Sequence, residues 1–497
     1  MTTLSHADWE KRAKDLKIEG RAFINGEYTD AASGETFECI SPVDGRLLAK
    51  VASCDTADAQ RAVESARKTF NSGAWSRLAP VKRKAAMLRF AALLNKNVEE
   101  LALLETLDMG KPISDSFSID ITGAAQALSW SGEAIDKLYD EVAATPHDQL
   151  GLVTREAIGV VAAIVPWNFP LLMACWKLGP ALSGGNSVVL KPSEKSPLTA
   201  IRIAQLAIEA GIPAGVLNVV PGYGHTVGKA LALHMDVDTV VFTGSTKIAK
   251  QLLVYSGESN MKRVWLEAGG KSPNIVFADA PDLQAAAESA ASAIAFNQGE
   301  VCTAGSRLLV ERSIKDTFLP MVIEALKGWK PGNPLDPATT VGALVDTQQM
   351  NTVLSYIEAG HSDGAKLVVG GKRILQETGG TYVEPTIFDG VTNAMKIAQE
   401  EIFGPVLSVL TFDTAEEAIQ IANDTPYGLA AAVWTSNLSK AHLTAKALRA
   451  GSVWVNQYDG GDMTAPFGGF KQSGNGRDKS LHAFDKYTEL KATWIKL

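Results

Sequence analysis

The chain has 497 residues, of which 46% are apolar and 21% are charged, and its formal net charge is -8. This composition is typical of a globular protein with large buried cores, and it excludes a nucleic-acid-binding protein, for which a basic face is expected. The length predicts two or three domains at roughly 150 residues each.

Four cysteines, Cys39, Cys54, Cys175 and Cys302, are widely spaced and form no C-x-x-C motif. This pattern indicates a reducing compartment and neither a disulfide framework nor a zinc site, and we expect no metal. The N-terminus carries acidic residues and no apolar core, so we expect no secretory signal. The longest apolar run, residues 158–165, is far shorter than the roughly 20 residues that span a bilayer, so we expect a cytoplasmic protein without a membrane.

The N-terminal region predicts a β-hairpin followed by packed helices. Asn25 and Gly26 form a pair between apolar residues, the commonest signal for a tight hairpin. Apolar residues at helical spacing begin after Asp55 and again at Pro80, and a third helix is expected to end near Gly110.

The sequence pattern changes at residues 139–157, where short segments of alternating apolar and polar residues predict a two-stranded ribbon. Strand-like runs then alternate with helical patterns, and the runs are residues 158–165, 187–190, 216–220, 239–242 and 264–266. Strands separated by helices of 10 to 20 residues predict a parallel, doubly wound sheet. A second α/β unit is predicted after residue 270. Ligands of such sheets bind beyond the carboxyl ends of the strands.

Two of these strand ends predict a dinucleotide site. Lys191 and Glu194 follow a strand at a spacing that lets both side chains meet the hydroxyls of an adenosine ribose, and a carboxylate there repels a 2'-phosphate. Gly244 and Ser245 open a helix, whose N-terminal N–H groups favour phosphate. A solvated ion pair on a loop is the alternative for Lys191 and Glu194.

Cys302 lies on a predicted loop between a helix that breaks at Gly299 and a strand that begins at Leu308. An ordinary thiol is only a few per cent ionised at neutral pH, so a catalytic cysteine needs a base nearby. Glu267 ends a predicted strand before a glycine pair and is a candidate for that base. An inert, half-buried cysteine is the alternative.

Three motifs in this order, VPWNFP at 165–170, VWLEAGGK at 264–271 and NQGEVCTAGSR at 297–307, resemble the aldehyde dehydrogenase superfamily. The resemblance covers about residues 23–491. It implies that Cys302 is the nucleophile, that Glu267 is the general base for thioester hydrolysis, and that Asn168 donates to the oxyanion. A general base at Glu267 implies a free carboxylic acid as the product.

The resemblance also implies NAD as the cofactor, with NADP possible. The implied cofactor-binding residues are Trp167, Lys191, Ser193, Glu194, Gly228, Gly244, Ser245, Gln349, Glu401 and Phe403. The chain departs from the family at Ala249, where a glycine is common after G-S-T, and this departure puts a close approach of helix and cofactor at that point in doubt.

The implied fold class is α/β, with two doubly wound domains and a small β oligomerisation ribbon. The first is a variant Rossmann domain that binds NAD, and the second is catalytic. The implied boundaries are 1–138 with 158–269 for the NAD-binding domain, 270–475 for the catalytic domain, and 139–157 with 476–497 for oligomerisation. The expected assembly is a homo-oligomer, a dimer or a tetramer.

Within the superfamily, segments 461–464 and 474–480 resemble bacterial γ-glutamyl-γ-aminobutyraldehyde and 4-guanidinobutyraldehyde dehydrogenases of polyamine and arginine breakdown. The implied substrate residues are Phe169, Trp176, Tyr458, Asp459, Asp462 and Phe467. The two aspartates would bind an amino or guanidino end, unless they only cap turns at the surface.

Three alternatives stay open. These are a broad-specificity aliphatic or aromatic aldehyde dehydrogenase, a cysteine-dependent esterase or acyl hydrolase, and a catalytically silent structural member of the family. A silent member is expected to lose Cys302 or Glu267, and both are present.

Overall fold

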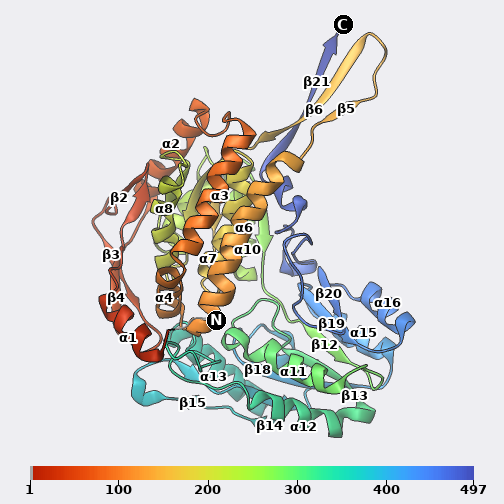
Figure 1. Ribbon diagram of the computed structural model, residues 1–497. Coiled ribbons are helices and arrows are strands. Elements are labelled where there is room, and N and C mark those ends of the chain that lie inside the picture. The colour runs from red at the N-terminus through yellow and green to blue at the C-terminus, as the bar shows by residue number, and fades with distance from the viewer. Residues whose placement is uncertain (1–3) are drawn as a thin grey trace.

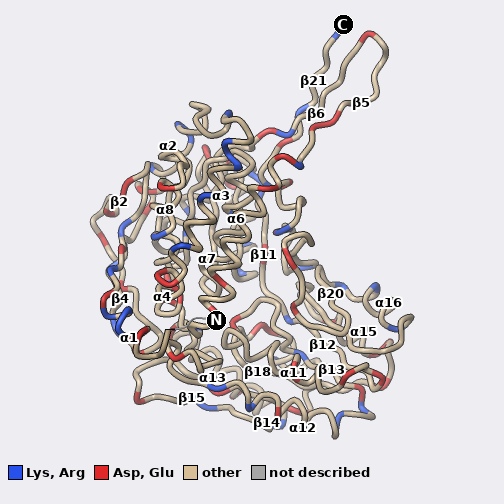
Figure 2. Tube along the Cα trace, viewed as in Figure 1, with Lys and Arg blue, Asp and Glu red and all other residues tan. Residues whose placement is uncertain are grey.

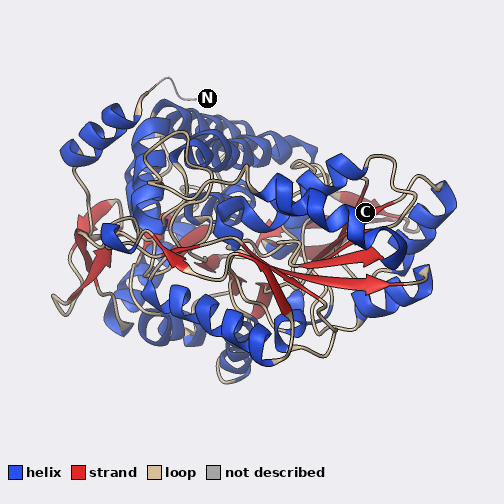
Figure 3. Ribbon diagram, turned by 90° about the horizontal axis from the view of Figure 1, so that it is seen from below, coloured by secondary structure: helices blue, strands red, loops and turns tan. Residues whose placement is uncertain are grey.

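The computed structural model describes residues 4–497. Within that range the chain forms two α/β units, one above the other in Figure 1, and an arm that projects from the body and carries the C-terminus. Helices lie on both sides of the sheets when the molecule is turned by 90° (Figure 3). This arrangement explains why the central strands are continuous apolar runs, because a parallel strand covered on both faces has no solvent side.

The sheet of the first unit has the strand order β11-β10-β7-β8-β9-β1-β2. Its strands are β1 (Ala22–Ile24), β2 (Glu27–Thr29), β7 (Val160–Ile164), β8 (Ser187–Lys191), β9 (Leu217–Val219), β10 (Thr239–Thr243) and β11 (Arg263–Glu267). Strands β7 to β11 pair in parallel, and the predicted hairpin β1–β2 adds an antiparallel edge. The predicted doubly wound layer is confirmed.

The three helix limits predicted for the first unit are confirmed, because one helix begins after Asp55, one begins at Pro80 and one ends before Gly110. They are α1 (His6–Asp15), α2 (Thr56–Ser72), α3 (Pro80–Lys96), α4 (Val98–Met109), α5 (Ile113–Asp115), α6 (Ile121–Ala134), α7 (Pro170–Ser183), α8 (Leu198–Glu209), α9 (Lys229–Leu233) and α10 (Thr246–Gly257). Asp55 caps α2 by accepting a hydrogen bond from the backbone N–H of Ala57, and Gly110 ends α4 with φ 90°. The Asp55 carboxylate gives a partner to a backbone N–H at the start of α2, and the left-handed glycine stops α4.

The sheet of the second unit has the order β14-β17-β18-β13-β12-β19-β20. Its strands are β12 (Pro273–Val276), β13 (Arg307–Glu311), β14 (Lys366–Val369), β17 (Thr386–Asp389), β18 (Val406–Phe412), β19 (Ala430–Trp434) and β20 (Ser452–Val455). Its helices are α11 (Leu283–Ala295), α12 (Lys315–Leu326), α13 (Thr347–Ser362), α14 (Lys396–Gln399), α15 (Ala415–Asn423) and α16 (Leu438–Ala447). Short hairpins β3 (Thr36–Ile40) with β4 (Leu47–Ala52) and β15 (Arg373–Ile374) with β16 (Tyr382–Val383) lie outside both sheets.

The arm consists of β5 (Glu141–Ala143), β6 (Gln149–Ala157) and β21 (Thr488–Lys496). The predicted ribbon at 139–157 is present, and the C-terminal strand pairs antiparallel with β6 along its whole length. Charged residues of both signs are scattered over the two units and the arm (Figure 2). No helix within residues 4–497 has the length and apolar character needed to cross a membrane.

Candidate active site

A cleft of about 630 Å³ lies between the two units. Three of its lining residues come from separate segments: Asn168 after β7, Glu267 at the end of β11, and Cys302 in the loop before β13. The other predicted residues that line it are Trp167, Trp176, Lys191, Ser193, Glu194, Gly228, Gly244, Ser245, Gln349, Glu401, Phe403 and Phe467. The structure therefore brings the candidate catalytic groups and the candidate cofactor residues into one cavity.

Cys302 is half-buried on its loop. Burial raises the pKa of its thiol, and the carboxylates of Asp459, Glu401 and Glu267 raise that pKa further. The thiol is therefore protonated at neutral pH until a base removes the proton or a cation enters the cleft. The other cysteines, Cys39, Cys54 and Cys175, are fully buried in the first unit.

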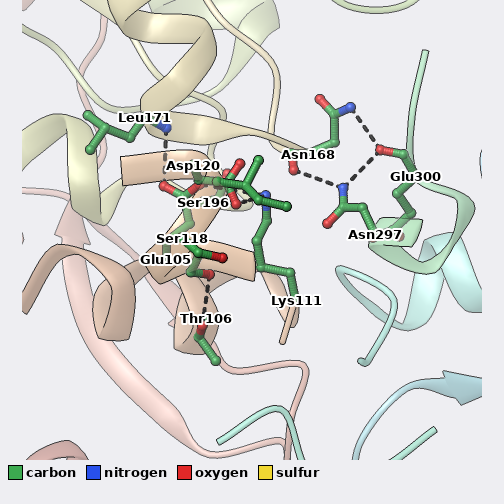
Figure 4. Close-up of polar contacts among 12 residues, drawn as sticks. Glu105, Thr106, Lys111, Ser118, Asp120, Asn168, Leu171, Ser196, Asn297 and Glu300 are labelled. Carbon is green, nitrogen blue, oxygen red and sulfur yellow. Dashed lines mark hydrogen bonds and ion pairs between the residues drawn. The ribbon is translucent and has the colours of Figure 1, made fainter. Parts of the chain in front are cut away.

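The Asn168 side chain is buried and tied to the Cys302 loop, as Figure 4 shows. Its Nδ2 donates to the carbonyl of Glu300 at 2.8 Å, and Asn297 Nδ2 donates to the carbonyls of Asn168 and Glu300, both at 3.1 Å. An amide carries two N–H donors, so a second donor of Asn168 remains for a ligand. These hydrogen bonds hold the Asn168 amide next to the segment that carries the Cys302 thiol.

Glu267 is 3% exposed, and neither of its carboxylate oxygens has a hydrogen-bond partner among the described residues. Burial raises the pKa of this carboxyl well above its ordinary value, with Asp478 adding to the rise and Lys177 and Lys486 opposing it. A carboxyl whose pKa is raised in this way takes up a proton more readily than an ordinary carboxylate, as a general base must.

Lys177, Asp478 and Lys486 form a buried group beside Glu267 that the sequence motifs did not single out. Both lysine Nζ atoms pair with the Asp478 carboxylate, one on each oxygen, and all three side chains are at most 2% exposed. We call this group the base-rich cluster. One signal in the sequence could have found it, because an isolated Lys177 inside an apolar helix needs a buried partner.

Of the two residues predicted to bind the adenosine ribose, Lys191 is buried and its Nζ lies 3.0 Å from a carboxylate oxygen of Glu194. Burial alone would raise the pKa of Glu194, but the Lys191 ammonium, a backbone N–H and Lys195 together outweigh burial, and the pKa is lowered. Glu194 is therefore ionised at neutral pH. Ser245 caps α10 by accepting from the backbone N–H of Ile248, and both residues line the cleft, so the N-terminus of α10 borders it. Such a helix N-terminus favours a phosphate.

Glu401 and Phe403, two of the predicted cofactor-binding residues, also line the cleft. A Cβ at Gly269 would lie 2.1 Å from Glu401, whose carboxylate accepts from the backbone N–H of Gly270 at 3.0 Å. The rings of Trp167 and Phe403 meet edge to face with centroids 5.1 Å apart. Phe403 has φ 57°, a left-handed conformation that costs free energy and that is found most often at functional sites.

Gln349 lines the cleft and also fixes the turn that carries Phe403. Its Nε2 donates to the carbonyl of Ile402 at 3.2 Å and to the carbonyl of Phe403 at 2.7 Å. One buried polar atom in the same cleft, Oγ1 of Thr243, has no hydrogen-bond partner among the described residues. The cleft thus offers an ion pair, the N-terminus of α10, a carboxylate and two rings, groups that can bind hydroxyls, a phosphate and a flat ring.

The predicted substrate residues divide between two cavities. Trp176 and Phe467 line the main cleft, with their ring centroids 5.2 Å apart. Tyr458 and Asp459 line a smaller cavity of about 90 Å³ that also contains Thr303, the neighbour of Cys302. Phe169 is buried, and its ring centroid lies 6.1 Å from that of Phe296, which lines the smaller cavity.

Asp459 is held close to the nucleophile. Its carboxylate accepts from Thr303 Oγ1 at 3.4 Å, and Tyr458 Oη donates to the Thr303 carbonyl at 2.6 Å. Burial raises the pKa of Asp459 to about 6, while Lys479 opposes the rise. Lys479 lies with its Nζ 4.9 Å from the ring centroid of Trp176, and the sequence motifs did not identify it as a site residue.

Asp462 is exposed and is not brought to either cavity. Its carboxylate accepts from the backbone N–H of Thr464 at 2.8 Å, so it caps a local turn. Within residues 4–497, no group of three or more His, Cys, Asp or Glu side chains is arranged to hold a metal ion.

Comparison with known proteins adds to this geometry. The family described as "Aldehyde dehydrogenase family" matches residues 28–493. The NADP/NAD-dependent aldehyde dehydrogenase PuuC of Escherichia coli K12 is 58% identical over 99% of this chain and 98% of its own length. The fold and the order of the motifs are therefore shared along nearly the whole chain.

Two solved structures superimpose on the chain. The C302A mutant of the Pseudomonas syringae indole-3-acetaldehyde dehydrogenase AldA, in complex with NAD+ and IAA, is 90% identical with a TM-score of 0.99 and full coverage of both chains. The γ-glutamyl-γ-aminobutyraldehyde dehydrogenase of Burkholderia cenocepacia J2315 is 62% identical with a TM-score of 0.98, covering 99% of this chain and 100% of the other.

Proposed function

The chain belongs to the aldehyde dehydrogenase family, and we propose that it oxidises an amino-, guanidino- or γ-glutamylamino-butyraldehyde from polyamine and arginine breakdown to the free acid with NAD. The observation that carries this proposal is the shared cleft, in which Cys302, Glu267 and Asn168 face residues that fit a dinucleotide. PuuC is named for use of NADP as well as NAD, and the ionised Glu194 favours NAD here.

Chemistry begins at Cys302. Its thiolate adds to the aldehyde carbon and gives a tetrahedral adduct with a negatively charged oxygen. The free N–H of Asn168 and the backbone N–H of Cys302 would stabilise that oxygen, and removing one such donor typically costs ~10²–10³ in rate. When bound, NAD supplies the hydride acceptor through which the adduct becomes a thioester.

Glu267 would then remove a proton from the water that hydrolyses the thioester. Its raised pKa suits this task, because a base that is too acidic would not take the proton. The same carboxylate can take the proton of Cys302, whose pKa is also raised by burial. The acid is released and the thiol is regenerated.

The charges around Cys302 support a substrate with a charged far end. Asp459 offers a carboxylate in the smaller cavity, and Lys479 offers an ammonium beside the ring of Trp176. A γ-glutamylamino group carries both an ammonium and a carboxylate, so its two charges match this pair. Charge-assisted contacts of this kind are worth roughly 1–2 kcal/mol each when partly desolvated.

A second candidate substrate is an aromatic acetaldehyde. The 90% identical AldA is named for indole-3-acetaldehyde, and the rings of Trp176 and Phe467 form an edge-to-face pair in the cleft. An indole ring would gain contact area there, but it carries no charge for Asp459 or Lys479 to bind. The two substrate classes therefore make different demands on Asp459.

We also propose a cytoplasmic homotetramer. The arm exposes large apolar side chains, with Trp494 at 63% and Leu497 at 74% exposure. An exposed strand edge with apolar side chains is stabilised when a second copy covers it.

The decisive experiment measures absorbance at 340 nm with NAD and a panel of aldehydes, for the wild type and for Cys302→Ala. We expect reduction of NAD by the wild type and at least a ~10³-fold loss in the variant, because the other thiols are buried away from the cleft. A variant that keeps a tenth of the wild-type rate would contradict the assignment. Ester cleavage without NAD reduction would instead indicate a cysteine hydrolase.

Asp459→Asn tests the substrate class, with Asp462→Asn as the matched control. We expect KM for 4-guanidinobutyraldehyde to rise about tenfold in Asp459→Asn, or ~1.4 kcal/mol, while KM for indole-3-acetaldehyde stays within twofold. Asp462→Asn leaves both values unchanged because its carboxylate faces Thr464. If KM changes by the same factor for both substrates in Asp459→Asn, Asp459 does not bind the charged end of the substrate.

A further inference from the structure

A second buried charge group lies on the other side of Asn168, and the chemistry above does not use it. Lys111 Nζ lies 2.8 Å from Asp120 Oδ2 and 3.6 Å from Glu105 Oε1, and all three side chains are fully buried (Figure 4). We call these residues the acid-rich cluster. None of the three lines the cleft, so they contact neither the aldehyde nor the cofactor.

The acid-rich cluster contacts the two residues that bracket the turn into α7. Glu105 Oε2 accepts from the backbone N–H of Leu171 at 3.2 Å, and Lys111 Nζ lies 4.0 Å from the ring centroid of Phe169. Desolvated contacts of an ammonium with a ring are among the stronger members of their class. Asn168 directly precedes Phe169, so both contacts act on the short segment that carries the amide.

That segment has few bonds of its own. Phe169 is non-helical, with φ -137° and ψ 69°, and α7 begins only at Pro170, which has no N–H. Leu171 then holds one of the backbone donors that the first turn of a helix leaves without an internal partner. Glu105 satisfies that donor from α4.

Asn168 is consequently held from two directions. The Cys302 loop holds it through the carbonyl of Glu300 and the amide of Asn297. The acid-rich cluster holds the following residues from the helical side. If either support were absent, the amide could rotate away from the position in which its second N–H serves a ligand, and a misplacement of about 1 Å can cost ~10²-fold in rate.

We propose that the acid-rich cluster is a positioning unit for Asn168, which acts through Phe169 and Leu171 to hold the amide in place before the oxyanion forms. The inference rests on the proposed role of Asn168 as an oxyanion donor. It assigns to Glu105 and Lys111 an effect on the rate of adduct formation and not on binding.

The test uses Lys111→Met, Glu105→Ala and Glu105→Gln, each alone and in an Asn168→Ala background. Lys262→Met is the matched control, because Lys262 is 5% exposed and bonded to the Ala232 carbonyl and Ser259 far from Asn168. Single-turnover reduction of NAD with propanal gives the combined rate of adduct formation and hydride transfer, and steady-state kinetics give KM for NAD.

We expect Lys111→Met and Glu105→Ala to slow the single-turnover rate about tenfold with KM for NAD within twofold. Glu105→Gln keeps an acceptor for Leu171 and should recover at least half of the rate, while Lys262→Met leaves it unchanged. In the Asn168→Ala background, the same substitutions should change the rate less than twofold, because residues that act through one group are not additive.

Two results overturn the inference. One is an undiminished tenfold loss in the Asn168→Ala background, and the other is an equal loss in Lys262→Met. If Lys111→Met does not fold, the comparison of Glu105→Ala with Glu105→Gln decides, since a structural role predicts no rescue of rate at equal stability. Asn168→Ala alone at the wild-type rate would instead overturn the proposed function, so the two failures are distinguishable.

Discussion

Two buried clusters of charged side chains contact helix α7, and their surplus charges have opposite signs. The acid-rich cluster at Leu171 sets two carboxyl groups against one lysine, and the base-rich cluster at Lys177 sets two lysines against Asp478. In the first, burial and the neighbouring Asp120 raise the pKa of Glu105 to about 8. In the second, burial opposes the lysines but they prevail, and the pKa of Asp478 is lowered.

The difference shows two ways to keep an unbalanced charge inside a protein. The acid-rich cluster neutralises its surplus by keeping a proton on Glu105 near neutral pH. The base-rich cluster exerts its surplus on a neighbour, because Lys177 and Lys486 favour the ionised form of Glu267 against the effect of burial. The first arrangement supports a neutral amide, Asn168, and the second tunes a base that must ionise during turnover.

Glu267→Gln should have the largest effect on kcat, because it removes the carboxylate on which the base-rich cluster acts. We expect kcat to fall by roughly 10²–10⁴-fold, with hydride transfer partly preserved, since the base acts chiefly on the thioester. Stopped-flow absorbance at 340 nm should show a burst of NADH followed by slow turnover. Equal loss in the burst and in the steady state would mean that Glu267 also deprotonates Cys302.

Lys486→Met removes one of the two positive charges in the base-rich cluster. Breaking a buried ion pair typically costs 3–5 kcal/mol, and the remaining Lys177 limits the cost here to about 3 kcal/mol in the free energy of unfolding, measured with denaturant. The pKa of Glu267 should rise further, so the rising limb of the pH profile of kcat moves to higher pH. Lys262→Met is again the control. If the rising limb of the pH profile does not move in Lys486→Met, the base-rich cluster does not set the pKa of Glu267.

The sequence predicts much of the fold and only part of the site, for a physical reason. The strands from β7 to β11 are predictable because each is an apolar run that ends in a turn, and the Cys302 loop is predictable because α11 stops before Gly299. These are local signals, set by the backbone preferences of neighbouring residues.

Contacts between distant segments carry no such signal. Lys177 and Asp478 are 301 residues apart, and no sequence pattern near either residue predicts their contact. The sequence likewise treats Asp459 and Asp462 alike, yet one accepts from Thr303 beside the nucleophile and the other accepts from Thr464 at the surface. Which way a side chain turns from an irregular loop depends on tertiary packing.

The proton held by Glu105 should also affect the stability of the folded chain. The pKa of Glu105 is raised from its ordinary 4.5 to about 8, first by burial and then by Asp120, with Lys111 and the Leu171 N–H opposing the rise. Between these two pH values the folded chain keeps a proton that the unfolded chain has released. The wild type therefore loses stability from this group as pH rises through that window.

Glu105→Gln cannot titrate at this position, whereas Asp108 and Asp115, whose pKa values burial also raises to about 7, remain in both chains. We therefore expect the free energy of unfolding of the wild type, relative to Glu105→Gln, to fall by about 3 kcal/mol between pH 5 and pH 8. Urea unfolding at several pH values measures this difference. Asp462→Asn should run parallel to the wild type over the same range, because its pKa is lowered by the hydrogen bonds from Thr464 and it stays ionised. If the curve of Glu105→Gln also runs parallel, Glu105 is ionised in the folded protein, and the acid-rich cluster balances its charge in some way other than by holding a proton.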